Sequence, residues 1–284
     1  MKKILLLLTF TLTSFIVLIS CKDENLITGA SNATDTTANN SNSGSTTKCY
    51  LNNEIETKDG SSYKSTFIYN TKNLLEKINN DGSISTYEYD TNNRVTRLTL
   101  VDGAAKETFT YTYDSKGNIV KVVYDATGTP YDILIKDYTF TSNANGQVTK
   151  VSANTPNGVV SFGFEYDAKN NLKKIVLTGG GQTETVIENL TFDDKPNVYT
   201  NSGLGKVHIP LILLGTLFGG NLSYYMNTNN ILTDKSLSFF GLDVSTTTYK
   251  YEYNKDNLPT KKTYTTTIGT DKSTGSNTYS YTCK

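Results

Sequence analysis

A short motif that recurs along most of the chain constrains the fold more than any other feature of the sequence. It reads aromatic-x-aromatic-Asp/Asn-x-x-Gly/Asn, and an apolar residue and a Thr/Lys-rich stretch follow it. The second aromatic residues of the eight copies are Tyr69, Tyr89, Tyr113, Phe140, Tyr166, Phe192, Tyr253 and Tyr281. They lie 20 to 28 residues apart, except for one step of 61 residues. A period of this size indicates a repeated supersecondary unit.

Each copy predicts a strand that ends in a tight turn. Phe109, Tyr111 and Tyr113 alternate with threonines, and aromatic residues on one face at period two are typical of a half-buried strand. Asp114 then begins a turn in which its side chain can accept backbone hydrogen bonds. Gly117, three residues later, tolerates the positive φ of a type I turn with a G1 bulge.

The strand after each turn shows an unusual apolar spacing. Val95 and Leu98 lie three residues apart, and so do Ile119 and Val122. Residues three apart fall on opposite faces of a regular strand, so the first of each pair is expected in the turn or in a bulge. A helix would also accept this spacing, but the turn residues and the β-branched content favour a strand.

The repeats therefore predict an all-β fold for residues 49–284. Two strands for each repeat give about 14–16 strands in an antiparallel meander of hairpins. Twist and repeated bulges would bend the meander into one strongly curved sheet or an open barrel.

The repeats resemble the YD repeats of Rhs-type proteins, in which Tyr-Asp and Gly mark successive hairpins. The resemblance covers nearly all of residues 60–284 and implies an architecture without catalytic residues. The chain also resembles uncharacterised Bacteroidota lipoproteins with a few YD-like repeats, and the segment FDDKPN at 192–197 looks like one that recurs in them. This family implies a β-repeat body and no particular activity. A toxin-enclosing shell is disfavoured because the repeats are few.

Residues 1–20 have the pattern of a secretory signal peptide, with basic Lys2 and Lys3, an apolar run and a small residue before Cys21. The sequence Leu-Ile-Ser-Cys resembles the lipobox of bacterial lipoproteins, which implies cleavage before Cys21 and acyl chains, such as palmitate, on that residue. An uncleaved membrane helix is the alternative, but the apolar run is shorter than the roughly 20 residues that a span requires. We therefore expect a lipid anchor at Cys21.

The residues after Cys21 predict a surface-exposed protein on a flexible tether. Lys22, Asp23 and Glu24 resemble the signal that sends Bacteroidota lipoproteins through the outer membrane to the cell exterior; the periplasmic face is the alternative. The rest of residues 21–48 has no aromatic residue and little apolar content, so this linker cannot offset the entropy of ordering. As a random coil it would span about 25–30 Å.

An insert around residues 197–235 interrupts the repeats where the spacing widens to 61 residues. Its most apolar part, 207–218, is too short to cross a bilayer, and we expect a short helix beginning near Pro210. The helix would be a plug on the concave side of the sheet, or a lid or docking surface for a lipophilic ligand. Its candidate residues are Ile209, Leu211, Leu213, Leu214, Leu217 and Phe218.

Motifs for catalysis or cofactor binding are missing from the sequence. His208 is the only histidine, which leaves little scope for a His-based nucleophilic pair. Asp193 and Asp194 could hold Ca²⁺, although turn chemistry explains them as well. Once Lys2 and Lys3 leave with the leader, 25 basic and 27 acidic residues remain. This balance argues against nucleic-acid binding and gives no sign of attraction to anionic lipids.

Two cysteines remain once Cys21 carries lipid. Cys49 opens the repeat domain and Cys283 is the penultimate residue, and both fall where strands are expected. Disulfides persist in exported proteins, and domain termini often lie close together. We expect a disulfide that brings the first and last strands together; two separate buried thiols are the alternative.

These features predict a lipid-anchored, outer-membrane lipoprotein that is a non-catalytic binding or structural module. A glycan, a protein or a lipid would be its ligand, without a cofactor or metal. The alternatives are a polysaccharide hydrolase, whose carboxylate pair only geometry could reveal, and a carrier of a lipophilic ligand.

The two interpretations of the insert give opposite outcomes for a charged substitution at Leu213 or Leu217. If the insert is a plug, Leu213→Asp should unfold the domain, because a buried unpaired charge is costly. If it is a lid or docking surface, the variant should fold normally and lose ligand binding. Thermal melting and a binding assay separate the two, and normal results in both would contradict each interpretation.

Overall fold

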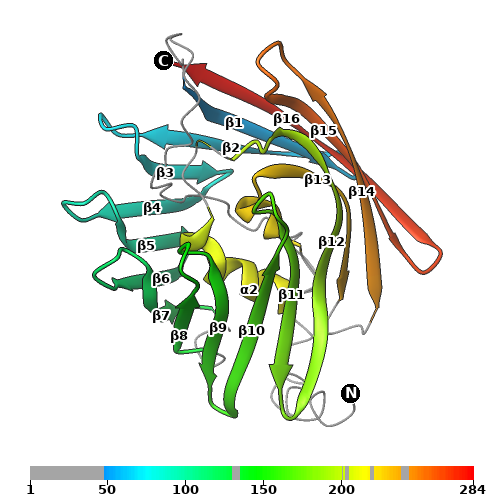
Figure 1. The fold of residues 1–284 in the computed structure, drawn as a ribbon. Helices are drawn as coiled ribbons and strands as arrows, with labels where there is room; N and C mark the ends of the chain where they lie inside the picture. The colour runs from blue at the N-terminus through cyan, green and yellow to red at the C-terminus, as the bar shows by residue number, and fades with distance from the viewer. Residues whose placement is uncertain (1–47, 130–134, 200, 202–204, 218–220, 238–242) are drawn as a thin grey trace.

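The computed structural model describes residues 48–129, 135–199, 201, 205–217, 221–237 and 243–284, which form a closed antiparallel β-barrel (Figure 1). Each strand pairs with its neighbours in chain order, and the last strand returns to pair with the first. The strands are β1 (Cys49–Lys58), β2 (Ser61–Tyr69), β3 (Leu75–Asn80), β4 (Ser83–Tyr89), β5 (Val95–Asp102), β6 (Ala105–Tyr113), β7 (Ile119–Thr127), β8 (Asp137–Ser142), β9 (Val148–Thr155), β10 (Gly158–Tyr166), β11 (Leu172–Gly179), β12 (Gln182–Pro196), β13 (Asn229–Leu237), β14 (Val244–Tyr253), β15 (Pro259–Ile268) and β16 (Asp271–Cys283). The all-β meander predicted from the repeats is confirmed, and its sheet closes completely.

The turn predicted from the repeat forms at the Asp/Asn positions. The side-chain Oδ1 of Asp90 accepts the backbone N–H groups of Asn92 at 2.8 Å and Arg94 at 2.9 Å. Asn93 has a φ of 60°, and its N–H donates to the Asp90 carbonyl at 3.1 Å. The same side-chain bonds recur at Asn70, Asp114, Asn143, Asp167 and Asn254. One local motif therefore builds this kind of turn along the whole barrel.

A bulge next to each of these turns explains the apolar spacing of three. Tyr89 pairs with Val95 while Glu88 pairs with Arg97, so one residue of β5 has no partner opposite it. The shift returns Leu98 to the inner face with Val95, and both are buried. Equivalent register shifts follow the other turns of this type. The bulge inferred from the sequence is confirmed.

The second aromatic residue of a repeat links one hairpin to the previous one. The Tyr113 hydroxyl donates to the carbonyl of Val95 at 2.7 Å, and the Tyr89 hydroxyl donates to the carbonyl of Leu75 at 2.6 Å. Tyr166 and Tyr281 make the same bond to Val148 and Pro259. Each acceptor is the first residue of its strand and directly precedes the bulge, where the ladder is locally disrupted. This bond accounts for the tyrosine hydroxyl at these four copies of the repeat.

The barrel closes along a seam between β1 and β16. Cys49 and Cys283 are register partners, and the expected disulfide joins them, with Cα atoms 3.9 Å apart. Beside it, Lys48 and Lys284 exchange backbone hydrogen bonds of 2.9 and 3.0 Å. The crosslink encloses most of the described chain, and the loop-entropy model then gives about 4–5 kcal/mol of stabilisation.

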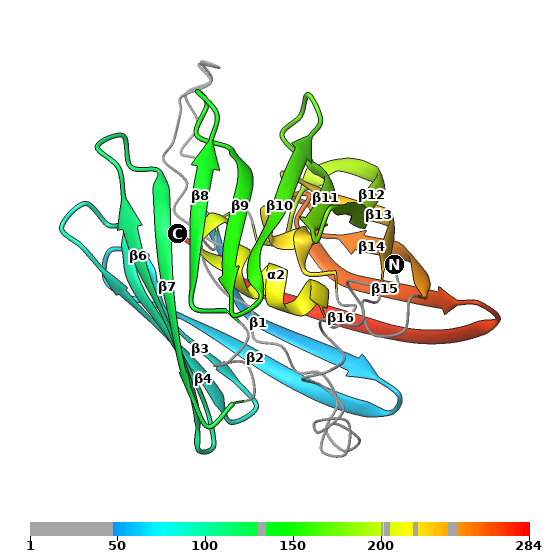
Figure 2. The same cartoon turned by 90° about the horizontal axis from the view of Figure 1, so that it is seen from below.

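The insert leaves the sheet after β12, and its described helices lie in the barrel interior. Strand β13 already begins at Asn229, so the insert is shorter than the predicted range 197–235. It contains η2 (Lys206–His208), α2 (Ile209–Leu217) and η3 (Ser223–Met226). Figure 2 shows α2 lying inside the ring of strands. Ile209, Leu211, Leu213 and Leu214 are at most 5% exposed. This burial agrees with the interpretation of the helix as a plug. Leu217 is the last residue of the helix, and Phe218 lies outside the described residues.

The described helices are all too short or too polar to cross a membrane. The residues predicted to carry the lipid and the export signal, Cys21, Lys22, Asp23 and Glu24, lie outside the described part of the chain, as does the signal peptide.

Removing the hydroxyl of Tyr113 should destabilise the barrel. Tyr113→Phe leaves the Val95 carbonyl without its donor, and the expected cost is about 1 kcal/mol of unfolding free energy. Tyr69 provides a matched control, because its buried hydroxyl has no hydrogen-bond partner among the described residues; Tyr69→Phe should be neutral or stabilising. Urea unfolding measures both, and equal effects would contradict the role of the bond.

Candidate functional site

Polar contacts join the insert to the barrel wall. The Tyr87 hydroxyl lies 3.1 Å from His208 Nε2, and the Tyr111 hydroxyl donates to the carbonyl of Val207 at 2.6 Å. Both tyrosines are inward-facing residues of the repeat motif. His208 is 1% exposed, and burial lowers its pKa to about 3. The histidine is therefore neutral at physiological pH and holds the plug in place.

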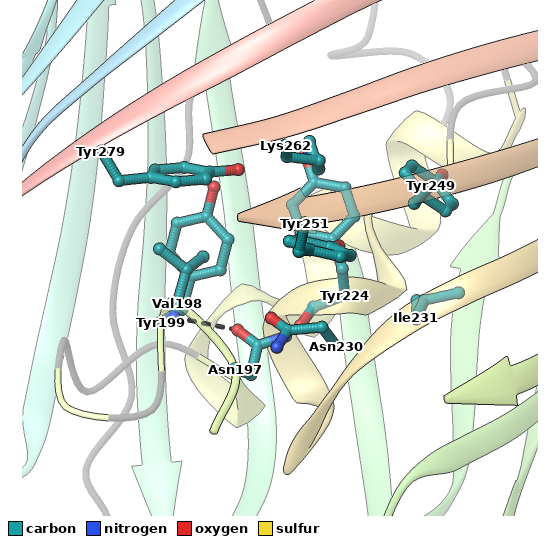
Figure 3. A pocket seen from close by; sticks show the side chains of 10 residues that line it. All are labelled: Asn197, Val198, Tyr199, Tyr224, Asn230, Ile231, Tyr249, Tyr251, Lys262 and Tyr279. Carbon is teal, nitrogen blue, oxygen red and sulfur yellow. Dashed lines mark hydrogen bonds between the residues drawn. The ribbon is translucent and has the colours of Figure 1, made fainter. Parts of the chain in front are cut away.

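A small polar cavity lies where the insert meets strands β13 to β16 (Figure 3). Its free volume is about 10 Å³, which is enough for about one water molecule. Figure 3 shows tyrosine rings and the Lys262 side chain around it. The lining residues are Asn197, Val198, Tyr199, Tyr224, Asn230, Ile231, Tyr249, Tyr251, Lys262 and Tyr279.

Lys262 is the buried cation of this cluster. It is 8% exposed, and its ammonium lies 5.1, 5.8 and 5.7 Å from the ring centroids of Tyr224, Tyr249 and Tyr264. These are cation–π distances. Burial lowers the pKa of Lys262, and the carboxylates of Glu54, Glu56 and Asp234 partly oppose that effect.

Glu54 connects three parts of the structure that are far apart in sequence. On β1 it accepts a hydrogen bond of 2.7 Å from the Tyr199 hydroxyl of the insert and another of 2.7 Å from Asn277 on β16. Burial raises the pKa of Glu54, and the charge of Lys262 partly offsets the increase. The side chain thus ties the plug to the seam.

Two further carboxylates bind tyrosine hydroxyls around Lys262. Asp234 is fully buried and accepts a hydrogen bond from Tyr249 at 2.6 Å; burial raises its pKa. Glu56 accepts from Tyr264 at 2.7 Å. The Tyr264 ring lies over Gly275, where a Cβ atom would come closer than 3.0 Å to the ring and its hydroxyl. Glycine at 275 therefore allows this bond.

The arrangement suits stabilisation more readily than chemistry. The carboxylates already accept hydrogen bonds from tyrosine or asparagine, the amine lies among aromatic rings, and the cavity has room for little more than water. Within the described ranges, no three His, Cys, Asp or Glu side chains gather as they would around a metal ion.

Asp193, considered above as a Ca²⁺ ligand, has another role. Its Oδ1 accepts the backbone N–H groups of Lys195 and Asn230, both at 3.0 Å. Its Oδ2 accepts the Asn230 side-chain amide at 3.0 Å and the Tyr253 hydroxyl. Four protein donors occupy the two oxygens, so this carboxylate fastens the point where the insert leaves and re-enters the sheet.

The polar cluster was not recognised in the sequence. Lys262 lies two residues before Tyr264, and side chains two residues apart in a strand lie on the same face. This spacing predicts that Lys262 points inward with Tyr264. Glu54 offered no such sign, because the pairing of β1 with β16 shifts between Leu51 and Asn53. Simple alternation from Leu51 would place Glu54 outside, whereas the irregularity turns it inward.

Comparison with known proteins supports the repeat and the fold. Residues 69–105 match the sequence profile of the family described as RHS Repeat. No curated protein has a matching sequence. A porin-like protein from Bacteroides uniformis has a similar structure, with 15% identity over 81% of this chain and 97% of that one and a TM-score of 0.51. At this identity the likeness establishes a common fold.

Two other solved structures have TM-scores of 0.36. A porin-like protein from Bacteroides vulgatus is 12% identical over 82% of this chain and 99% of its own. The TcdB2-TccC3-Cdc42 structure is 13% identical over 79% of this chain and 14% of the matched chain.

The burial of His208 predicts a specific pH dependence. Its folded-state pKa of about 3 lies below the unfolded value of 6.5, so the unfolded chain binds the proton more tightly. The contribution of neutral His208 to the unfolding free energy is therefore fully present well above pH 6.5 and is lost as the pH falls toward 3. Relative to His208→Gln, the native protein should lose about 2 kcal/mol of unfolding free energy between pH 7 and pH 5. Denaturant titrations at both pH values test this, and parallel pH profiles would contradict it.

Proposed function

We propose that the protein is an exported, lipid-anchored component of the bacterial envelope whose sealed barrel is a non-catalytic binding or structural module. The observation that carries the proposal is the disulfide between Cys49 and Cys283. Such bonds form and persist in oxidising compartments outside the cytoplasm. This supports export by the signal peptide at residues 1–20 and attachment through Cys21.

The packed interior supports a non-catalytic role. The apolar face of α2 occupies the space in which a lipophilic carrier would hold its ligand, and the adjoining cavity has room for about one water molecule. The perturbed groups, including Glu54 and His208, bind other parts of the protein rather than an open cleft. We therefore favour recognition through the outer surface.

The outer surface suits polar partners. Cross-strand ion pairs run along it, including Glu88 with Arg97 at 3.5 Å and Glu252 with Lys261 at 3.4 Å. These side chains are 43–67% exposed, so each pair contributes little stability and remains free to exchange partners. A glycan or a protein with a charged, hydrated surface is the class of ligand that such a face would accept.

Anchoring and surface exposure can be tested together in a bacterium that processes lipoproteins. The native protein should incorporate a labelled fatty acid and remain with the outer membrane, whereas Cys21→Ala should do neither.

An added protease should degrade the native protein on intact cells if Lys22, Asp23 and Glu24 direct it outward. A triple alanine variant at 22–24 should stay lipidated and become protected. Fatty-acid labelling of Cys21→Ala equal to that of the native protein would overturn the anchor.

A further inference from the structure

The meander topology separates the loops of the barrel into two groups at opposite ends. Turns that follow even-numbered strands lie at the same end as the start of β1 and the finish of β16. The chain leaves this end at Lys48 toward the tether and Cys21. We call these turns, with Lys48, Lys206 and Lys284, the tether rim. Hairpins that follow odd-numbered strands form the distal end.

At the tether rim, the aspartate carboxylates of the turns accept hydrogen bonds from the backbone of their own turn. Asp90, Asp114 and Asp167 each accept two backbone N–H groups of their own turn, at 2.8–2.9 Å. Hydrogen bonds from Asn118 lower the pKa of Asp114, and those from Arg94 lower that of Asp90. These carboxylates are therefore ionised but directed toward the backbone.

Three turns of this kind carry an exposed lysine. Lys72, Lys116 and Lys169 occupy the third position of three turns, and all are exposed. They follow β2, β6 and β10 and are thus spread around the circumference. The other exposed rim lysines are Lys48, Lys206, Lys255 and Lys284. Asp194 and Asp256 also lie here, each paired with an adjacent lysine.

The distal end carries exposed charges of both signs. The exposed residues of its hairpins include Asp59, Asp81, Asp102, Asp243 and Asp271. Lys64, Lys106, Lys136 and Lys272 are exposed lysines in or beside the same hairpins, and three of them serve as controls below. The excess of exposed lysine therefore lies at the tether rim, which the near-zero net charge of the whole chain does not reveal.

We infer that the tether rim rests on the anionic headgroups of the membrane that holds the anchor, with the distal hairpins directed away from it. Charge complementarity selects the partner, because lysines near an anionic surface are each attracted to it. The described chain begins at this rim, at Lys48, 27 residues after the proposed anchor at Cys21. The inference rests on the proposed anchor at Cys21.

Amine labelling of the lipidated full-length protein on vesicles tests the orientation. With phosphatidylglycerol in phosphatidylcholine vesicles, a soluble acetylating reagent should modify Lys72, Lys116 and Lys169 at least about tenfold more slowly than on phosphatidylcholine alone. Lys106 and Lys272 should react equally on both. The protection should vanish in 1 M salt, where the screening length falls to about 3 Å. Mass spectrometry of peptides gives each rate.

Charge reversal provides the matched control. In the variant Lys72→Glu, Lys116→Glu, Lys169→Glu, the remaining rim residues Lys255 and Lys284 should lose their protection. The variant Lys64→Glu, Lys106→Glu, Lys272→Glu has the same net charge and should keep it. Equal labelling of the rim on both vesicles by a protein that still floats with them would overturn the orientation and leave the anchor intact. Failure to float at all would overturn both.

Discussion

Pairing of β1 with β16 is the constraint on which the rest of this structure depends. A meander of hairpins has two edge strands with unpaired backbone groups, and such edges invite aggregation. Here the backbone groups of β1 pair with those of β16, and the disulfide between Cys49 and Cys283 holds the two strands in register. Closure also creates an interior that must be filled, because sixteen strands enclose more space than their own side chains occupy.

The insert fills that interior, and its attachment is unusually polar. Apolar residues of α2 supply the packing, while His208, Tyr199 and Val207 make hydrogen bonds to the wall. Burying such groups is tolerable only when they are paired. The neutral histidine and the high pKa of Glu54 have the same cause: the sealed barrel disfavours isolated charge. Specific bonds of this kind fix the position of the plug, which apolar packing alone would leave less defined.

The same turn motif builds the fold and distributes charge. Its Asp or Asn side chain accepts backbone N–H groups, and in three of the turns the residue two positions later is an exposed lysine, Lys72, Lys116 or Lys169. Because the turn recurs around the barrel, these three lysines are spread around the end where the described chain begins. Opposite hairpins use Asp-Gly tips such as Asp59-Gly60, in which the aspartate stays exposed.

The sequence by itself determined the repeat unit, the Asx turns, the bulges and the apolar helix, because each depends on residues that are close together in the chain. It also determined Cys49 and Cys283 as the disulfide partners, because they are the only cysteines left once Cys21 carries lipid. Tertiary structure alone decided that the sheet closes, that α2 lies inside it, and that Glu54, Asp234 and Lys262 meet around one small cavity. These groups belong to β1, β13 and β15 and are brought together only by the curvature and register of the whole barrel. A single irregularity near Asn53 reverses which face of β1 is buried, and local alternation could not reveal it, because a shift of one residue moves every following side chain to the other side.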